Sequence, residues 1–150
     1  MSKFLIVLTA LFVLGCSSVS FKEMAVNDIL LKTQRNMHVW ASTEFVVKST
    51  GVGIHSHDKG IWFLNSAYSY RSSESLNVRL STQVVEQFKR QYKIDDIAEL
   101  RGKKIQVVGT ATPEKFCLKM GCPKSPGIAR PTMYIQTQLK IEDLSNIRVL

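Results

Sequence analysis

Alternation of apolar and polar residues predicts short β-strands along most of the chain. The clearest case is SLNVRL, residues 75–80, where Leu76, Val78 and Leu80 would share one face of a half-buried strand. Runs rich in β-branched and aromatic residues predict further strands. These further strands cover residues 37–49, 61–68, 103–111, 132–138 and 146–150.

One helix and one helical turn interrupt the predicted strands. Residues 81–92 carry apolar side chains at the helical period with charged ones opposite, and Ser81 or Thr82 could cap the helix start. Residues 94–102 predict a short helical turn with Asp95 as its cap. The chain therefore runs as three strands, a helix, and two or three further strands.

Glycine and proline mark two longer connections. Residues 51–60 contain three glycines, which is typical of a turn or a bent strand end. Residues 112–131 contain all four prolines of the chain and predict a long loop. No internal repeat or second domain boundary is visible, and 150 residues suffice for one domain with its own core.

The longest apolar run stands near the start of the chain. Residues 4–14 are apolar except for Thr9, and a run of this length is too short to span a bilayer but fits the hydrophobic region of a secretory signal. The sequence VLGC that follows, residues 13–16, resembles the lipobox of bacterial lipoproteins. The alternative is an ordinary secretory signal with an incidental cysteine.

The lipobox resemblance implies a domain organisation and a location. Residues 1–15 would be the lipoprotein signal peptide, residues 16–36 the lipidated cysteine and a tether, and residues 37–150 the folded domain. Acylated Cys16 would anchor the protein in the bacterial cell envelope. By the same resemblance, Ser17 after the cysteine would permit sorting to the outer membrane, with the domain facing the periplasm.

The order of the predicted elements is also the order of the OB-fold, a small five-stranded Greek-key barrel. The stretches GIWFLNSAY, LNVRLS and LRGKKIQVVGTA resemble exported bacterial OB-fold domains, over roughly residues 39–150. The resemblance implies a mainly β fold, a five-stranded OB-fold-like barrel with one helix between strands three and four. Another small β-barrel or β-sandwich with one helix is the alternative.

The positive charge is concentrated in one part of the sequence. The net charge is +8, and residues 101–130 hold seven basic residues and one acidic residue. In an OB-fold the loops 51–60 and 112–131 would flank the ligand face, and basic loops beside aromatic rings suit anionic ligands. The candidate ligand-binding residues are therefore Lys103, Lys104, Lys115, Lys119, Lys124, Arg130, Trp62 and Tyr70.

A different interpretation of these residues stays open. The aromatic side chains could belong to the core, and the lysines could form a solvated face without a ligand. The run Ile61-Trp62-Phe63-Leu64 does not alternate, so the sequence leaves open which strand face carries Trp62.

Two further groups of residues have metal-binding or redox alternatives. Cys117 and Cys122 lie close together in CLKMGC, and in an oxidising compartment such a pair normally forms a disulfide. Metal ligation and two free thiols are the alternatives for this pair. His55 and His57 would share a face of a strand, as some metal ligands do, but without further ligands we interpret them as polar loop residues.

The motifs of common enzyme classes are missing from the sequence. It contains no G-x-S-x-G elbow, no phosphate-binding glycine loop and no H-E-x-x-H motif. We therefore predict a non-catalytic envelope protein without a cofactor that binds an anionic oligosaccharide, nucleic acid or lipid head group. The alternatives are a structural or assembly lipoprotein that docks another envelope protein, a metal-handling lipoprotein, and a hydrolase whose site the sequence does not display. The oligomeric state stays open.

Overall fold

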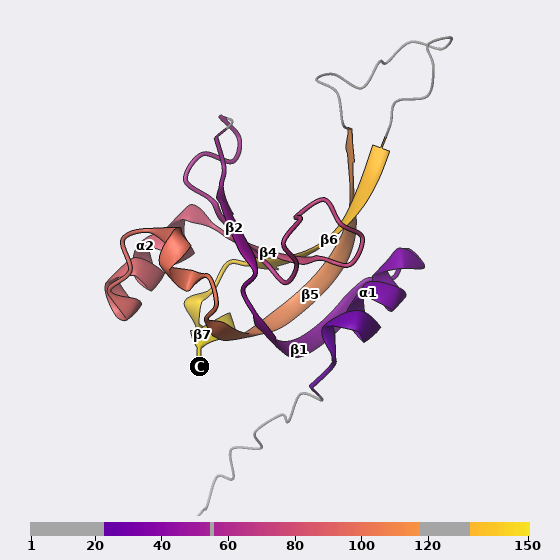
Figure 1. Ribbon diagram of the computed structural model, residues 1–150, viewed down its shortest axis with the longest axis horizontal. Coiled ribbons are helices and arrows are strands. Elements are labelled where there is room, and N and C mark those ends of the chain that lie inside the picture. Colours follow the sequence, from indigo (N-terminus) through magenta and orange to yellow (C-terminus); the bar gives the residue numbers. More distant parts are fainter. Residues whose placement is uncertain (1–22, 55, 118–132) are drawn as a thin grey trace, which may run out of the picture.

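A computed structural model describes residues 23–54, 56–117 and 133–150, which form a mainly β domain (Figure 1). Its helices are α1 (Val26–Gln34), α2 (Thr82–Tyr92) and the 3-10 helices η1 (Ile97–Leu100) and η2 (Leu144–Asn146). Its strands are β1 (Val39–Val46), β2 (Ser49–Val52), β3 (Trp62–Asn65), β4 (Leu76–Leu80), β5 (Lys104–Cys117), β6 (Met133–Ile141) and β7 (Ile147–Val149).

The strands of the described ranges form one mixed sheet. Seven strands follow the order β1-β5-β6-β4-β3-β2, with β7 paired to β5, and every pairing is antiparallel except that of β4 with β6. The predicted strand 37–49 is divided into β1 and the start of β2 by a bend at Val47 and Lys48. The mainly β prediction is confirmed, whereas the sheet has seven strands in an open order where five in a barrel were predicted.

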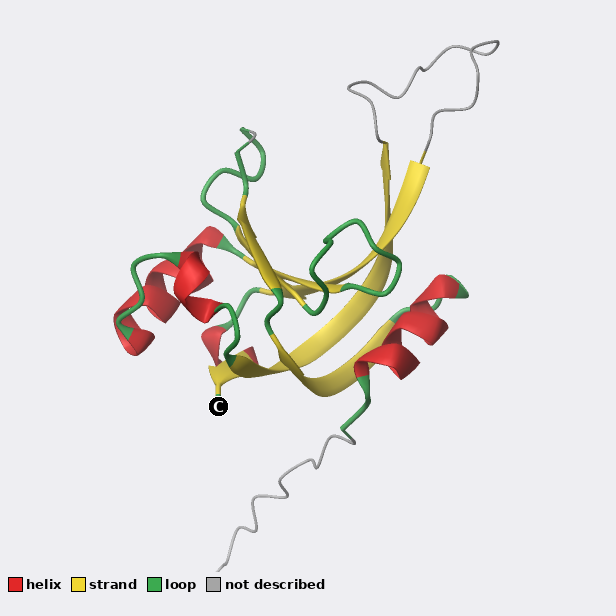
Figure 2. Cartoon of the chain, in the orientation of Figure 1, coloured by secondary structure: helices red, strands yellow, loops and turns green. Residues whose placement is uncertain are grey.

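The core lies against the inner face of the sheet, which we define by Leu76, Val78 and Leu80 of β4. All three are fully buried, as the alternation of residues 75–80 predicts. Helix α2 adds Val84, Val85 and Phe88 to the same core, while α1 packs on another part of the curved sheet (Figure 2). The opposite face of the sheet is called the outer face below.

Helix α2 agrees with its prediction, but the predicted cap of the next helical turn is wrong. The Ser81 hydroxyl accepts a hydrogen bond from the Val84 amide at 3.4 Å at the start of α2. In η1 the cap is Asp96 and not Asp95, because Asp96 accepts from the Ala98 amide at 2.8 Å and Glu99 accepts from the Asp96 amide at 3.1 Å. A glutamate three residues after the cap completes this reciprocal pair.

Residues 26–34 form α1, where the sequence predicted a tether. Ile29 and Leu30 of this helix are buried in the core, and the Thr33 hydroxyl oxygen lies 2.7 Å from that of Thr137 in β6. The buried residues recur at helical spacing, but the pattern is blurred because the apolar Leu31 is exposed and the polar Thr33 is buried. The folded domain therefore begins before residue 37.

Strand β5 runs further than predicted, because residues 112–117 are extended and not part of a loop. Beyond Ala111, β5 is paired with β6 on one side only, since its pairing with β1 ends there. A strand edge of this kind tolerates a proline, which explains Pro113. In the predicted turn 51–60, Gly53 lies so close to the Asp58 carbonyl that a β-carbon would collide with it.

Candidate functional site

Trp62 belongs to the core, so its prediction as a ligand contact is wrong. Only 4% of its surface is exposed, and the Lys89 ammonium of α2 lies 5.4 Å from its ring centroid. Phe63 takes the outer face instead, opposite Arg79 of β4. The next aromatic residue of the prediction, Tyr70, is exposed in the β3–β4 connection.

The structure separates the basic residues that were predicted to share one surface. Lys104 begins β5 and Lys115 lies eleven residues further along it, which corresponds to about 35 Å of strand. Lys104 is bound to Glu44 of β1 with 2.6 Å between ammonium and carboxylate, and this hydrogen bond and the carboxylate charge raise the pKa of Lys104. Lys103 precedes β5 and is exposed, at the same end of the strand as Lys104.

Several predicted residues lie outside the part of the chain that the structure describes. For Cys117 the structure describes only the backbone, as the last residue of β5. The residues outside the described ranges are Cys16, His55, Lys119, Cys122, Lys124 and Arg130.

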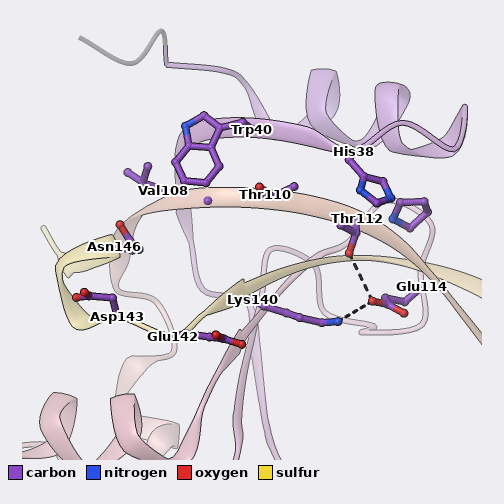
Figure 3. Close-up of a pocket in the computed structure, with 12 residues that line it drawn as sticks. His38, Trp40, Val108, Thr110, Thr112, Glu114, Lys140, Glu142, Asp143 and Asn146 are labelled. Carbon is purple, nitrogen blue, oxygen red and sulfur yellow. Dashed lines mark hydrogen bonds and ion pairs between the residues drawn. The ribbon is translucent and has the colours of Figure 1, made fainter. Parts of the chain in front are cut away.

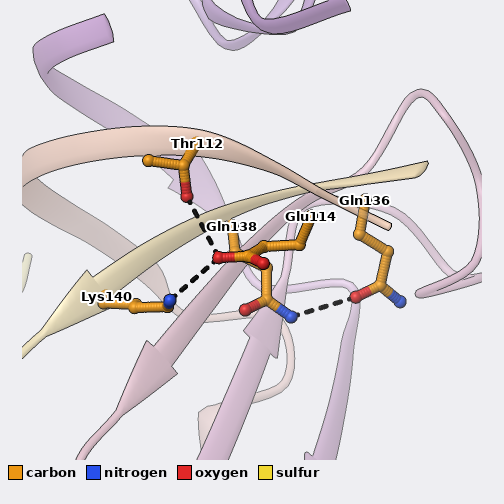
Figure 4. Close-up of polar contacts among 5 residues, drawn as sticks. All are labelled: Thr112, Glu114, Gln136, Gln138 and Lys140. Atoms are coloured by element: carbon orange, nitrogen blue, oxygen red, sulfur yellow. Dashed lines mark hydrogen bonds and ion pairs between the residues drawn. The ribbon is translucent and has the colours of Figure 1, made fainter. Parts of the chain in front are cut away.

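The connection between β3 and β4 is fixed to the outer face by buried amide side chains. The Tyr70 carbonyl accepts hydrogen bonds from the Asn77 amide at 3.2 Å and from the Gln136 amide at 3.0 Å. Gln138 donates in turn to Gln136 at 3.1 Å (Figure 4). Because buried amides require such partners, this network holds Tyr70 and its neighbour Arg71 in one place.

Tyr70, Arg71, Phe116 and Tyr134 form what we call the aromatic–arginine cluster. The Arg71 guanidinium lies 5.2 Å from the Tyr70 ring and 5.9 Å from the Tyr134 ring, and it donates to the Tyr70 hydroxyl at 2.9 Å. The Phe116 and Tyr134 rings are stacked at 5.6 Å between centroids. Phe116 and Tyr134 are partners in the β5–β6 register, beside the ends of the segment 118–132.

The charge state of the cluster is influenced by burial and by its own members. Desolvation raises the pKa of Tyr134 above 10.0, the nearby Tyr70 phenol raises it further, and Arg71 acts in the opposite direction. Tyr134 is therefore a neutral hydrogen-bond donor at neutral pH, beside the permanently charged Arg71.

An open groove of about 690 Å³ lies on the outer face of β1, β5 and β6 (Figure 3). Its side chains include Trp40, Thr110, Glu114, Lys140, Asp143 and Asn146. The Lys140 ammonium and the Glu114 carboxylate form an ion pair at 2.8 Å across β6 and β5 (Figures 3 and 4). The sequence did not predict this groove, because its walls come from segments far apart in the chain.

The described residues offer neither a metal cluster nor a membrane-spanning helix. No three His, Cys, Asp or Glu side chains in the described ranges are placed to hold a metal ion together. His57 is exposed in the connection between β2 and β3. Within the same ranges, every helix is too short or too polar to cross a bilayer.

Comparison with known proteins leaves the class of protein open. No protein-family model and no curated protein matches the chain. Among solved structures, the chain is similar to a putative aspartyl-tRNA synthetase from Leishmania major Friedlin, with a TM-score of 0.44 and 11% sequence identity. This similarity covers 93% of the chain and 23% of the synthetase, and at this level it supports no statement about function.

Proposed function

We propose that this protein is a non-catalytic, lipid-anchored binding protein of the bacterial cell envelope that binds an anionic ligand at the aromatic–arginine cluster. The ligand would be an acidic oligosaccharide, a nucleic acid or a lipid head group. The observation that carries this proposal is the position of Arg71 beside the Tyr70 and Tyr134 rings. The cluster adjoins the ends of segment 118–132, which contributes three basic residues and no acidic residue to the sequence.

The chemistry of the cluster suits a planar or cyclic anion. Arg71 is exposed, and the ion pairs found between described residues do not involve it. A guanidinium fork binds a carboxylate or phosphate through two parallel hydrogen bonds. The neighbouring phenol rings supply stacking surface for a base or a sugar.

The proposal includes an OB-fold-like Greek-key barrel as the finer description of the fold. β1 and β2 would then count as one bent first strand, because only Val47 and Lys48 separate them. The Val47 amide donates to the Lys103 carbonyl and the Lys48 amide to the Asn65 carbonyl, both at 2.9 Å, so hydrogen bonding continues through the bend. The parallel pairing of β4 with β6, and α2 after β4, also support this description.

Salt-dependent retention on heparin and on single-stranded DNA tests the anionic site. Arg71→Gln should elute from both columns at lower salt than the wild type, with a shallower dependence of affinity on salt, by about one released counterion. The matched control is Arg148→Gln, which changes an exposed arginine of β7 and should leave retention unchanged. Equal elution of both variants would remove the support for this site.

The basic segment beside the cluster can be tested in the same assay. Reversing Lys115, Lys119 and Lys124 to glutamate should abolish retention, because the ligand would then face three new negative charges. Reversing Lys22, Lys32 and Lys48, which changes the net charge by the same amount, should have a much smaller effect, since none of them belongs to the cluster or to the basic segment. If the control variant loses as much retention as the variant of the basic segment, binding depends on net charge only and the proposed site is wrong.

The lipid anchor is tested by fractionation of cells. The full chain should stay with membranes after a high-salt wash, because multiple acyl chains bind a bilayer far more firmly than one. Cys16→Ala should be released or remain uncut, whereas the control Ser18→Ala should behave as the wild type. A Cys16→Ala protein that is still processed and membrane-bound would contradict the lipoprotein assignment.

The proposed Cys117–Cys122 disulfide is tested by mass spectrometry of the exported protein without reductant. Closing so short a loop would stabilise the fold by roughly 2 kcal/mol on the chain-entropy model. After treatment with an alkylating reagent, the measured mass should show that neither Cys117 nor Cys122 has gained an alkyl group. Two alkylated thiols in the native protein would overturn this pairing.

A further inference from the structure

The Arg71 guanidinium already uses one of its hydrogen-bond donors within the protein. Its Nε atom donates to the Tyr70 hydroxyl at 2.9 Å, and its central carbon lies 5.2 Å from the centroid of the same ring. A guanidinium has five N–H groups, and the other four are on the two terminal nitrogens. Arg71 therefore offers a ligand the terminal end of the guanidinium, where two N–H groups point in parallel.

Two phenol groups beside Arg71 add further donors. The Tyr70 oxygen accepts from Arg71, so the hydrogen of its own hydroxyl is directed away from the guanidinium. The Tyr134 ring centroid lies 5.9 Å from the guanidinium, and desolvation raises the pKa of this phenol, so it keeps its proton at neutral pH. Tyr70 is exposed and Tyr134 is half-buried, so both side chains border the solvent. The terminal N–H groups of Arg71 and two O–H groups therefore lie together at one surface.

The acceptors near the cluster are already bound to other protein groups. The Tyr70 carbonyl receives hydrogen bonds from Asn77 at 3.2 Å and from Gln136 at 3.0 Å, which occupy both of its lone pairs. The Glu114 carboxylate lies two residues from the cluster on β5 and is bound by the Lys140 ammonium at 2.8 Å. This ion pair balances the acidic charge of that part of the strand. The cluster therefore presents donors to a ligand.

A surface made of donors favours a group that only accepts hydrogen bonds. An ionised carboxylate has two oxygens in one plane, and the terminal end of a single guanidinium pairs with both. The phenol hydroxyls would then have no partner on the acidic group. A terminal phosphate or sulfate ester has three acceptor oxygens in a tetrahedral arrangement. Two of these oxygens can pair with the guanidinium while the third accepts from a phenol.

We infer that the aromatic–arginine cluster binds a terminal phosphate or sulfate ester, carried by a sugar or a lipid head group, through Arg71 and the hydroxyls of Tyr70 and Tyr134. This inference rests on the proposed anionic site and narrows its ligand, because a uronic acid or a nucleic-acid diester has only two terminal oxygens in each acidic group. Phe116 stacks on Tyr134 at 5.6 Å between centroids, and two amides fix the Tyr70 carbonyl. Donors that are held in place before binding lose less conformational entropy on binding.

Three glucose derivatives that differ in a single group test this selectivity. Glucose 6-sulfate, glucose 6-phosphate and glucuronate are titrated into the full chain in detergent, and the Arg71 Nε–H signal is followed by NMR. The signal is assigned by its loss in Arg71→Gln. Both esters should bind about tenfold more tightly than glucuronate, which is the contribution expected from one additional charge-assisted hydrogen bond. Glucose 6-sulfate and glucuronate carry the same charge, so net charge does not explain a difference between them.

Removal of a single phenol hydroxyl tests which group provides the selectivity. Tyr134→Phe keeps the ring that stacks on Phe116 and removes only the O–H donor. It should weaken the binding of both esters by about tenfold and that of glucuronate by less than about twofold. A general disturbance of the fold would weaken all three probes alike. The matched control is Tyr68→Phe, which removes the hydroxyl of an exposed tyrosine outside the cluster and should bind as the wild type.

The source of the ester is identified with glycerol 3-phosphate for a lipid head group and a sulfated disaccharide for a sugar, and binding of either should be lost in Tyr134→Phe. Three outcomes would overturn the inference: glucuronate binds as tightly as glucose 6-sulfate, ester binding survives Tyr134→Phe, or a dinucleotide binds more tightly than either ester. If Arg71→Gln still lowers retention on heparin in these cases, the proposed anionic site stands without this selectivity. If Arg71→Gln leaves heparin retention unchanged, the proposed site itself is wrong.

Discussion

The two tryptophans lie in contrasting environments, and this predicts unequal losses of stability when each is removed. Trp62 is 4% exposed in the core, whereas Trp40 is 55% exposed in the groove. Trp62→Ala should lower the free energy of unfolding by about 3–5 kcal/mol, because it removes buried contacts and leaves a cavity. Trp40→Ala should lower it by less than Trp62→Ala does, because more than half of the Trp40 surface is already exposed in the native state. Urea denaturation followed by circular dichroism measures both, and equal losses would contradict the assigned environments.

The Tyr134 phenol should titrate above its ordinary pKa of 10.0, because desolvation raises its pKa. Absorbance at 295 nm should show a phenol titration above pH 10.0 that is missing in Tyr134→Phe. Arg71→Gln should raise this pKa further, since Arg71 lowers it in the wild type. If Tyr134→Phe changes the titration curve only near pH 10, then Tyr134 has its ordinary pKa and the prediction is wrong.

The same shift links stability to pH at the alkaline end. The folded pKa of Tyr134 lies above the unfolded one, so between the two values the native state keeps a proton that the unfolded chain has lost. Its contribution to stability is complete below about pH 10 and is lost as the pH rises through the folded pKa. Tyr134→Phe should therefore show a smaller loss of stability over that alkaline range than the wild type.

Helix η1 depends on one capping side chain, which makes two adjacent aspartates unequal. Asp96→Ala should destabilise the protein by about 1 kcal/mol, because the Ala98 amide loses its acceptor. Asp95→Ala should cost no more than about 0.5 kcal/mol, since the Asp95 side chain is exposed and its neighbour is the cap. Urea midpoints of the two variants provide the measurement. A larger loss for Asp95→Ala would show that the cap is wrongly assigned.

The whole domain includes α1, so contacts of this helix should support global stability. Ile29 is fully buried, and Ile29→Ala should cost about 2–5 kcal/mol. Leu31 is 57% exposed on the same helix, and Leu31→Ala should change stability by about 0.5 kcal/mol or less. In Ile29→Ala the urea midpoint of unfolding should fall by the same amount whether it is followed by tyrosine fluorescence or by circular dichroism. A tether that takes no part in the fold would give no difference between the two variants.

Sequence patterns within a few residues were sufficient for part of the fold. The strand at residues 75–80 and the helix that follows Ser81 were both predicted, because strand alternation and helix capping depend on close neighbours in the chain. The exposure of Tyr70 also agrees with its prediction as a surface residue. The tether expected before residue 37 was wrong, because an exposed apolar residue and a buried polar one, Leu31 and Thr33, blur the amphipathic pattern of α1.

The candidate sites required contacts between distant segments. The aromatic–arginine cluster joins Arg71 to Tyr134, and the groove joins Trp40 to Asn146, across separations that no local pattern spans. Trp62 lies in a run without alternation, so only the packing of α2 against the sheet decides which face it takes. Strand length likewise separates Lys104 from the aromatic–arginine cluster. Composition therefore determined that the chain is basic, whereas tertiary structure decided which charges lie together, since sheet pairing places residues by register and not by sequence distance.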